Sequence, residues 1–311
     1  MTELPPAQTN RWRAVVRVLR SPLDSLSCAI FPSSCSLCGA PLPQLTSAPV
    51  CDACWTEIRV QTGTACSRCG DSLNTPSGSG FSMLCRACRM APPRFERAVA
   101  FGPYEGRMRQ AIHALKYDRL HPVARALGKM LASAIATLAD DAPTEMLVVP
   151  VPLHRSKSAQ RGFNQARLLA AEALSFLHDS HPSWKLTLAD STLMRLRSTE
   201  SQAGLTPRQR RLNVRGAFSV TDASKIAGKH VLVIDDILTT GATARAAAKT
   251  LADAGAVSVW VATLARAQRF SRVGQEFTLD VFEDNEPLTG TMAAAMHAKG
   301  FKPAIPEQPS F

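Results

Sequence analysis

The stretch of sequence that most restricts the possible folds of this chain is Val231–Thr243, which reads VLVIDDILTTGAT. It begins as a continuous apolar run of the kind buried in parallel sheets, and that run ends in two adjacent carboxylates. A loop of threonine and glycine follows and leads into a helical pattern that begins near Ala242. Sheets of this type bind ligands beyond the carboxyl ends of their strands, where helix N-termini hold phosphate groups. The segment therefore predicts an α/β fold with a phosphate site at this turn.

The residue types in this turn indicate which phosphate compound would fit. The loop offers hydroxyl donors, a flexible backbone and helix N–H groups, supplied by Thr239, Thr240, Gly241, Ala242 and Thr243. Asp235 and Asp236 would repel a bare phosphate, but they can accept hydrogen bonds from sugar hydroxyls or face a metal ion. The pattern therefore suits a ribose 5-phosphate bound with Mg²⁺. An ordinary strand, turn and helix with solvated aspartates does not account for the whole pattern.

The same segment closely resembles the diphosphate-sugar signature of type I phosphoribosyltransferases. The resemblance implies that Asp235 and Asp236 are the catalytic pair and hold the ribose 2′- and 3′-hydroxyls. It also implies that residues 239–243 wrap the 5-phosphate of 5-phosphoribosyl-1-diphosphate, which binds together with Mg²⁺.

The rest of the chain supports this fold class and divides near residue 92, where Ala91-Pro92-Pro93 marks a stiff boundary. Apolar runs and helical patterns then alternate up to about residue 267, which predicts parallel βαβ units with right-handed crossovers. The patterns predict strands at 97–101, 146–151, 230–234 and 257–263, and helices at 107–117, 123–138, 164–177 and 242–254. We therefore expect a type I phosphoribosyltransferase-like parallel sheet, flanked by helices, over residues 93–267.

All nine cysteines lie before residue 89, and eight of them form four Cys-x-x-Cys pairs. Close pairs of this kind favour metal thiolates in a reducing compartment over disulfides. Residues 31–92 are therefore interpreted as a double zinc ribbon with structural, not catalytic, zinc. Taken in order, the ligand sets are Cys35, Cys38, Cys51 and Cys54, followed by Cys66, Cys69, Cys85 and Cys88. A cross-paired arrangement or the loss of one site remains open, and Cys28 is left as a plain thiol.

The two ends of the chain have weaker patterns. Residues 1–30 form a basic amphipathic segment whose arginines interrupt any apolar core of a signal peptide, and residues 268–311 are expected to be partly disordered. No apolar run reaches the roughly 18 residues that a membrane span needs. We therefore expect a cytoplasmic protein, and its net charge of +11 favours anionic partners.

Two basic segments are further candidates for the site. In type I phosphoribosyltransferases the loop after the strand equivalent to 146–151 contacts the pyrophosphate, so the resemblance makes Leu153, His154 and Arg155 candidates. Residues 195–215 hold six arginines and one acid, at the place where this enzyme class carries a mobile hood over the pyrophosphate. Arg195 and Arg197 are the candidates there. The same run can instead track a nucleic-acid backbone or be a solvated face.

Taken together, these features resemble the ComF (competence protein F) family. The resemblance rests on the cysteine ribbons, on residues 101–106, 113–117, 149–155 and 161–165, and on the loop through Thr243. Tyr104, Lys116 and Tyr117 fall in these family-like motifs without an assigned role. The resemblance implies a cytoplasmic role in DNA uptake during natural competence.

Two main functions from different classes fit the sequence, beside a third option, a ligand-sensing regulator that keeps the fold without turnover. In the first, the protein is a glycosyltransferase of nucleoside metabolism that moves the phosphoribosyl group to an unidentified nitrogen acceptor. In the alternative, the same fold is a non-catalytic adaptor that binds single-stranded DNA or other proteins of the competence machinery.

Overall fold

The computed structural model describes residues 34–43, 48–73, 83–118, 120–197, 209, 214 and 216–268. The expected amphipathic segment at 1–30 and Cys28 lie outside these residues. So do the expected tail beyond residue 268 and four of the six arginines counted between residues 195 and 215.

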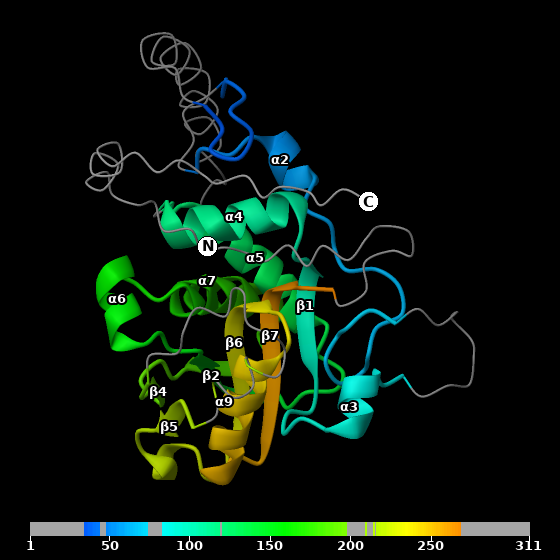
Figure 1. The fold of residues 1–311 in the computed structure, drawn as a ribbon, viewed down its shortest axis with the longest axis vertical. Helices are drawn as coiled ribbons and strands as arrows, with labels where there is room; N and C mark the ends of the chain where they lie inside the picture. The colour runs from blue at the N-terminus through cyan, green and yellow to red at the C-terminus, as the bar shows by residue number, and fades with distance from the viewer. Residues whose placement is uncertain are drawn as a thin grey trace, which may run out of the picture.

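A parallel sheet of five strands forms the centre of the described molecule, in the order β1-β7-β6-β2-β3 (Figure 1). The strands are β1 (Ala98–Pro103), β2 (Glu145–Pro150), β3 (Lys185–Leu188), β6 (His230–Leu238) and β7 (Ser258–Arg266). The two central strands, β6 and β7, are mostly buried, as expected for strands that are covered on both faces. The predicted parallel α/β fold is confirmed.

The helices cover the two faces of the sheet unequally. Helices α4 (Gly106–Tyr117), α5 (Val123–Ala136) and α7 (Gln165–Ser180) belong to one layer, and α9 (Ala242–Asp253) forms the other, in front of β6 and β7 in Figure 1. The connections from β1 to β2 and from β2 to β3 run in one direction along the sheet, whereas the connection from β6 to β7 runs in the opposite direction. Right-handed crossovers therefore place their helices on opposite faces.

Shorter elements complete the described structure. They are α2 (Asp52–Thr56), α3 (Arg86–Met90), α6 (Arg155–Arg161), the 3₁₀ helix η1 (Ala223–Lys225), and the antiparallel pair of β4 (Leu193–Arg195) with β5 (Phe218–Val220). The β4–β5 pair forms the base of the segment that was interpreted as the hood.

The cysteine segments pack against the sheet domain on both of its faces. Cys35, Cys54 and Ile58 of the first ribbon (residues 34–43 and 48–58) share one buried core with α4, α5 and α7. Cys66 and Cys88 of the second ribbon (residues 64–73 and 83–95) share the other core with α9. Figure 1 accordingly shows α2 beside α4 and α3 near the opposite end of β1. The two ribbons therefore straddle the sheet.

The chain between the ribbons crosses the edge of the sheet at β1. Gln61 donates its backbone N–H to the Phe101 carbonyl at 2.8 Å. A side chain on Gly102 would overlap the Arg59 carbonyl, so only glycine allows this close approach.

The last two strands extend further than the sequence predicted. Apolar runs suggested ends at residues 234 and 263, but β6 and β7 stay paired as far as Leu238 and Arg266. The ladder continues because backbone pairing does not depend on side-chain polarity, so it carries the two aspartates inside the sheet.

The tight contact between α5 and α7 gives a first prediction. Gly128 on α5 faces Glu172 and Ala173, and a Cβ there would overlap the Glu172 Cβ and lie 3.2 Å from the Ala173 nitrogen. We expect Gly128→Val to destabilise the fold by about 1–3 kcal/mol through overpacking. Urea unfolding measures this, with Ser133→Val on the exposed side of the same helix as the matched control. Equal stabilities of the two variants would contradict the packing described here.

Candidate functional site

A pocket of about 200 Å³ opens at the carboxyl ends of β2 and β6. These neighbouring strands lead to opposite sides of the sheet, so this is the point at which the strand order reverses and ligands of α/β sheets bind. The pocket is lined by Lys116, Tyr117, Val151, Pro152, Leu153, Lys157, Arg161, Gln165, Arg195, Asp235, Asp236, Ile237, Leu238, Thr239, Gly241, Ala242, Thr243 and Ala244. Most of the residues predicted from the Val231–Thr243 segment thus meet in one place.

The turn between β6 and α9 presents the start of a helix to this pocket. Gly241 has a φ of +76°, a left-handed conformation that favours glycine, and α9 begins at the next residue. Ala242 donates its N–H to the Thr240 hydroxyl at 3.4 Å. Thr239 and Thr243 line the pocket with Gly241 and Ala242, whereas Thr240 is not part of the lining. The partial positive charge of a helix N-terminus therefore faces the space where an anion would bind.

The two aspartates occupy different environments. Asp236 is almost fully buried, and its carboxylate forms an ion pair with Nζ of Lys116, which lies in the last turn of α4. Asp235 is partly exposed, and its carboxylate accepts a hydrogen bond from the Asp236 N–H at 2.9 Å. The two carboxyl groups are thus not equivalent, because only one of them carries the lysine.

The pKa values of these three groups diverge accordingly. Burial raises the pKa of Asp235 well above its usual value, and the neighbouring Asp236 carboxylate raises it further. Burial acts in the same direction on Asp236, but Lys116 outweighs it and lowers the Asp236 pKa. Burial opposes the charge of Lys116 too, yet the Asp236 carboxylate raises the Lys116 pKa overall. The pocket therefore contains one stable ion pair beside one carboxyl group that retains its proton to an unusually high pH.

Lys116 is the main site residue to which the sequence assigned no role. It lies in the motif at residues 113–117, and only the packing of α4 brings it to β6. Tyr117 beside it also lines the pocket, with the Arg161 guanidinium 4.9 Å from its ring centre. The sequence showed only a lysine in the last turn of an amphipathic helix. Such a lysine does not by itself indicate which carboxylate it will pair with.

The segment after β2 departs from the expected basic loop, because residues 155–161 form the short helix α6. His154 caps this helix, and its Nδ1 accepts a hydrogen bond from the Ser156 N–H at 3.3 Å. Leu153 lines the pocket, while His154 and Arg155 do not. Lys157 and Arg161, on the following turns of α6, contribute to the lining instead.

Of the predicted hood arginines, the structure brings Arg195 to the pocket. Arg195 ends β4, lines the pocket, and lies 5.6 Å from the ring centre of Phe218 on β5. Burial lowers its pKa, and Asp235 opposes that shift. Arg197 is exposed and is not part of the lining. Arg208, Arg210, Arg211 and Arg215 lie outside the described residues.

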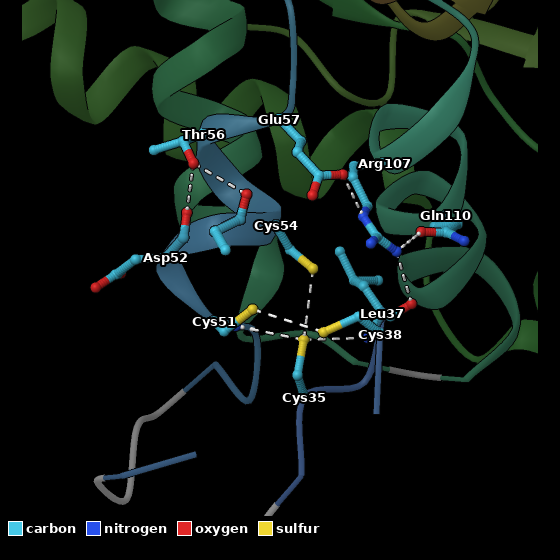
Figure 2. A network of polar contacts seen from close by, with 11 residues as sticks. Cys35, Leu37, Cys38, Cys51, Asp52, Cys54, Thr56, Glu57, Arg107 and Gln110 are labelled. Atoms are coloured by element: carbon cyan, nitrogen blue, oxygen red, sulfur yellow. Dashed lines mark hydrogen bonds and ion pairs between the residues drawn. The ribbon is translucent and has the colours of Figure 1, made fainter. Parts of the chain in front are cut away.

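The first ribbon gathers four sulfur atoms in one cluster, shown in Figure 2: Cys35, Cys38, Cys51 and Cys54. The Sγ atoms of Cys35 and Cys54 are 3.8 Å apart, and those of Cys38 and Cys51 are 3.7 Å apart. Tetrahedral zinc with Zn–S bonds of about 2.3 Å would separate its sulfurs by about 3.8 Å. Backbone N–H groups of Leu37 and Cys51 donate to Cys35 Sγ at 3.4 Å each, which favours a thiolate.

The second ribbon repeats this geometry with Cys66, Cys69, Cys85 and Cys88. Cys69 and Cys85 Sγ lie 3.7 Å apart, and the Cys85 N–H donates to Cys66 Sγ at 3.3 Å. Gly70 closes this knuckle at a φ of +66°. The structure thus gathers the cysteines four by four in chain order, and both sulfur sets fit a closed structural zinc site.

Within the part of the chain that the structure describes, no helix is both long enough and apolar enough to cross a membrane.

Comparisons with known proteins agree with both halves of this description. A family model for a double zinc ribbon domain matches residues 26–89, and one for a phosphoribosyl transferase domain matches residues 159–285. DNA utilization protein YhgH of Salmonella typhi is 31% identical over 237 residues, which cover 76% of this chain and 97% of that protein. Competence protein F of Haemophilus influenzae is 27% identical over 224 residues, covering 70% of this chain and 90% of that protein.

Among solved structures, a hypoxanthine phosphoribosyltransferase from Staphylococcus aureus matches with a TM-score of 0.30 and 14% identity, covering 49% of this chain and 69% of that one. This likeness is too weak to add to the argument.

The sulfur clusters predict the metal content of the protein. We expect two zinc ions per chain, and one after either Cys35→Ser or Cys66→Ser, because three thiolates hold zinc less tightly than four. Each variant should also melt at a lower temperature, since structural zinc contributes folding free energy. Metal analysis checks this, with Cys28→Ser as the control that keeps both ions. An unchanged zinc content in either cluster variant would contradict the assignment.

The raised pKa of Asp235 predicts how stability depends on pH. Its carboxyl group holds a proton more tightly in the folded than in the unfolded state. The contribution of Asp235 to stability is therefore largest below the ordinary carboxyl pKa of about 3.9, and it falls as the pH rises through the raised pKa of the folded state. Asp235→Asn keeps an oxygen for the Asp236 N–H but carries no charge. We therefore expect this variant to melt above the wild type at neutral pH, with the difference vanishing in acid. Asp179→Asn, at an exposed position on α7, is the control; a lower melting temperature for Asp235→Asn at neutral pH would contradict the assignment.

Proposed function

Because this chain belongs to the ComF family, which joins a double zinc ribbon to a phosphoribosyltransferase-type domain, we propose that it binds 5-phosphoribosyl-1-diphosphate in the pocket between β2 and β6. One observation carries the proposal. Two adjacent acids and a helix N-terminus line a single pocket at the reversal point of a parallel sheet. A ribose 5-phosphate carries both hydroxyl donors for the acids and an anion for the helix N-terminus in one molecule.

The lining suggests a place for each part of the ligand. The 5-phosphate binds at the start of α9, where Thr239, Gly241 and Thr243 surround it. The ribose hydroxyls donate to Asp235 and Asp236. The pyrophosphate then extends toward the basic side of the pocket, where Lys157, Arg161 and Arg195 neutralise its charge.

The ion pair of Lys116 with Asp236 has a consequence for the metal. Since Lys116 already balances Asp236, Asp235 is the carboxylate in this lining that is best placed to face a ribose hydroxyl or a hydrated Mg²⁺. Bound Mg²⁺ would offset charge on the pyrophosphate as it leaves. Its approach would also favour the ionised form of Asp235, so the ligand and the metal should bind with release of a proton.

We further propose that the protein transfers the phosphoribosyl group to a nitrogen acceptor. The bond between C1 and the pyrophosphate oxygen breaks with its electron pair on the oxygen, and the acceptor nitrogen forms the new bond to C1 and loses its proton to solvent. Arg161 and Arg195 stabilise the departing anion, and the carboxylates favour the positive charge that builds on the sugar.

The names of the relatives, DNA utilization protein and competence protein F, support a place for this reaction in the use of DNA that the cell has taken up. Nitrogen bases released by DNA breakdown have the chemistry of the required acceptor. The net charge of +11 and these same names support the second candidate, in which the protein binds single-stranded DNA as an adaptor.

Ligand binding is tested by thermal stabilisation with 5-phosphoribosyl-1-diphosphate, with and without Mg²⁺. We expect Mg²⁺-dependent stabilisation of the wild type that increases with pH, because Asp235 must lose its proton. Asp235→Asn should weaken binding by about 10- to 100-fold, the cost of losing about 1.5–3 kcal/mol from hydrogen bonds to a charged group. Asp179→Asn should bind as the wild type does. Equal stabilisation of all three proteins would remove the acids from the proposed site.

Turnover separates the two candidate functions. Release of pyrophosphate in the presence of candidate bases, dependent on Mg²⁺ and lost in the double variant Asp235→Ala and Asp236→Ala, is expected for the enzyme. Single-stranded DNA binding that weakens with salt and survives this double variant, without pyrophosphate release by the wild type, would favour the adaptor instead.

A further inference from the structure

A buried arginine connects the proposed ligand turn to the second ribbon. Arg266 ends β7, and only 1% of its surface is exposed. Its Nη1 donates to the carbonyl of Leu238 at 2.7 Å and also to the carbonyl of Thr239. These two carbonyls belong to the turn that joins β6 to α9. Arg266 does not line the pocket itself, so it acts on the turn from behind.

These hydrogen bonds orient the N–H groups of the turn. In a trans peptide the carbonyl of one residue and the N–H of the next point in opposite directions. With the Leu238 and Thr239 carbonyls directed at Arg266, the N–H groups of Thr239 and Thr240 must point away from it. The Ala267 N–H also donates to the Leu238 carbonyl, at 3.1 Å, whereas Arg266 reaches both carbonyls and so favours the orientation in which the turn can offer N–H groups to an anion.

The other side of the same guanidinium faces the second ribbon. Its Nη2 lies 3.2 Å from a carboxylate oxygen of Asp71, which is 2% exposed, and 4.0 Å from Cys69 Sγ. Asp71 is held in the knuckle, because its carbonyl accepts the Cys66 N–H at 2.8 Å. A buried ion pair is costly unless its geometry is maintained, so Arg266 needs the folded knuckle to keep its position.

A second arginine connects the start of α9, just after the turn in the chain, to the same ribbon. Arg245, in the first turn of α9, donates Nη1 to the Ala91 carbonyl at 2.6 Å and Nη2 to Cys88 Sγ at 3.7 Å. Arg266, which binds the ligand turn, and Arg245, which follows it in α9, therefore both contact a cysteine of one cluster. A zinc ion with four thiolates carries a net charge of about −2, which the two guanidinium groups offset.

The first ribbon contacts the domain elsewhere. Arg107, near the start of α4, pairs with Glu57 at 2.8 Å and donates to the Leu37 carbonyl at 3.1 Å, as Figure 2 shows. Here too an arginine of the sheet domain binds a carbonyl and a carboxylate of a ribbon. This contact involves neither the β6–α9 turn nor α9. It therefore provides a matched control.

We propose that the second zinc cluster is the anchor of the ligand turn and that Arg266 and Arg245 are positioning residues that connect them. The folded second knuckle holds both arginines, and the arginines hold residues 238–245 in the conformation that binds a phosphate group. Zinc in the second cluster and the ligand then stabilise each other's binding, whereas zinc in the first cluster has no such effect. The identity of the ligand rests on the proposed function; the anchoring of the turn does not.

The anchor is tested first without any ligand, by amide hydrogen exchange on the full-length protein. Cys66→Ser, which opens the second cluster, should speed exchange in peptides covering residues 238–245 by about tenfold or more, while Cys35→Ser should leave them unchanged. Arg245→Gln should speed exchange in the same peptides while both zinc ions remain bound, and Arg107→Gln should not. If opening either cluster affected these peptides equally, or if Arg245→Gln had no effect on them, the proposal would be overturned.

The coupling is tested next by the rate at which a chelator removes zinc. With Mg²⁺ and 5-phosphoribosyl-1-diphosphate present, we expect one of the two zinc ions to leave about 5- to 150-fold more slowly, the range typical of coupled sites. Arg266→Lys keeps the charge but cannot reach the carbonyls and Asp71 together, so it should keep both zinc ions and lose this protection. Arg107→Gln should retain it.

The two tests separate the possible failures. A ligand that binds the wild type and slows the loss of both ions equally, or of neither, contradicts the anchor. A ligand that does not bind the wild type contradicts the proposed function, and the exchange experiment then decides on the anchor alone.

Discussion

The reversal of strand order between β2 and β6 is the constraint on which the rest of the site depends. Right-handed crossovers send the chain from β2 toward one edge of the sheet and from β6 toward the other, which among the described residues leaves an opening at the carboxyl ends of this pair. Four separate segments can therefore approach the same opening: the turn before α9, the segment after β2, the last turn of α4 and the end of β4. The strand order of the sheet thus creates the opening, and the particular side chains then line it.

Within that opening, charge compensation decides how the two acids differ. Lys116 is nearly buried and pairs with Asp236, so the pKa of Asp236 is lowered although burial alone would raise it. Asp235 has the opposite shift. Pairs of titratable groups with pKa values driven apart are typical of functional sites, because the two members can then do different tasks. In this pocket the difference between the two aspartate pKa values is caused by Lys116. This lysine lies on α4, far from the two aspartates in the chain.

The ribbons are parts of the domain and not an appendage. Each shares a hydrophobic core with one helix layer, and the connection between them crosses β1, where Gly102 leaves room for it. The second ribbon also reaches the polar interior through Asp71, at a cost in desolvation that a purely structural zinc site would not require. This position links the metal sites to the proposed ligand turn.

Local patterns determined a large part of this protein. The apolar runs determined four of the five strands of the main sheet, the Val231–Thr243 segment determined the turn and its helix, and the Cys-x-x-Cys spacing determined the sulfur clusters, because each of these depends on residues close together in the chain. Tertiary structure decided that Lys116 and Arg161 join the pocket, that His154 caps a helix outside its lining, and that Arg266 reaches Cys69 across 197 residues. A contact of that kind depends on strand order and crossover handedness. It cannot be predicted from the spacing of residues in the sequence. A lysine at the end of a helix or an arginine at the end of a strand has the same local pattern whether it meets solvent or a buried carboxylate.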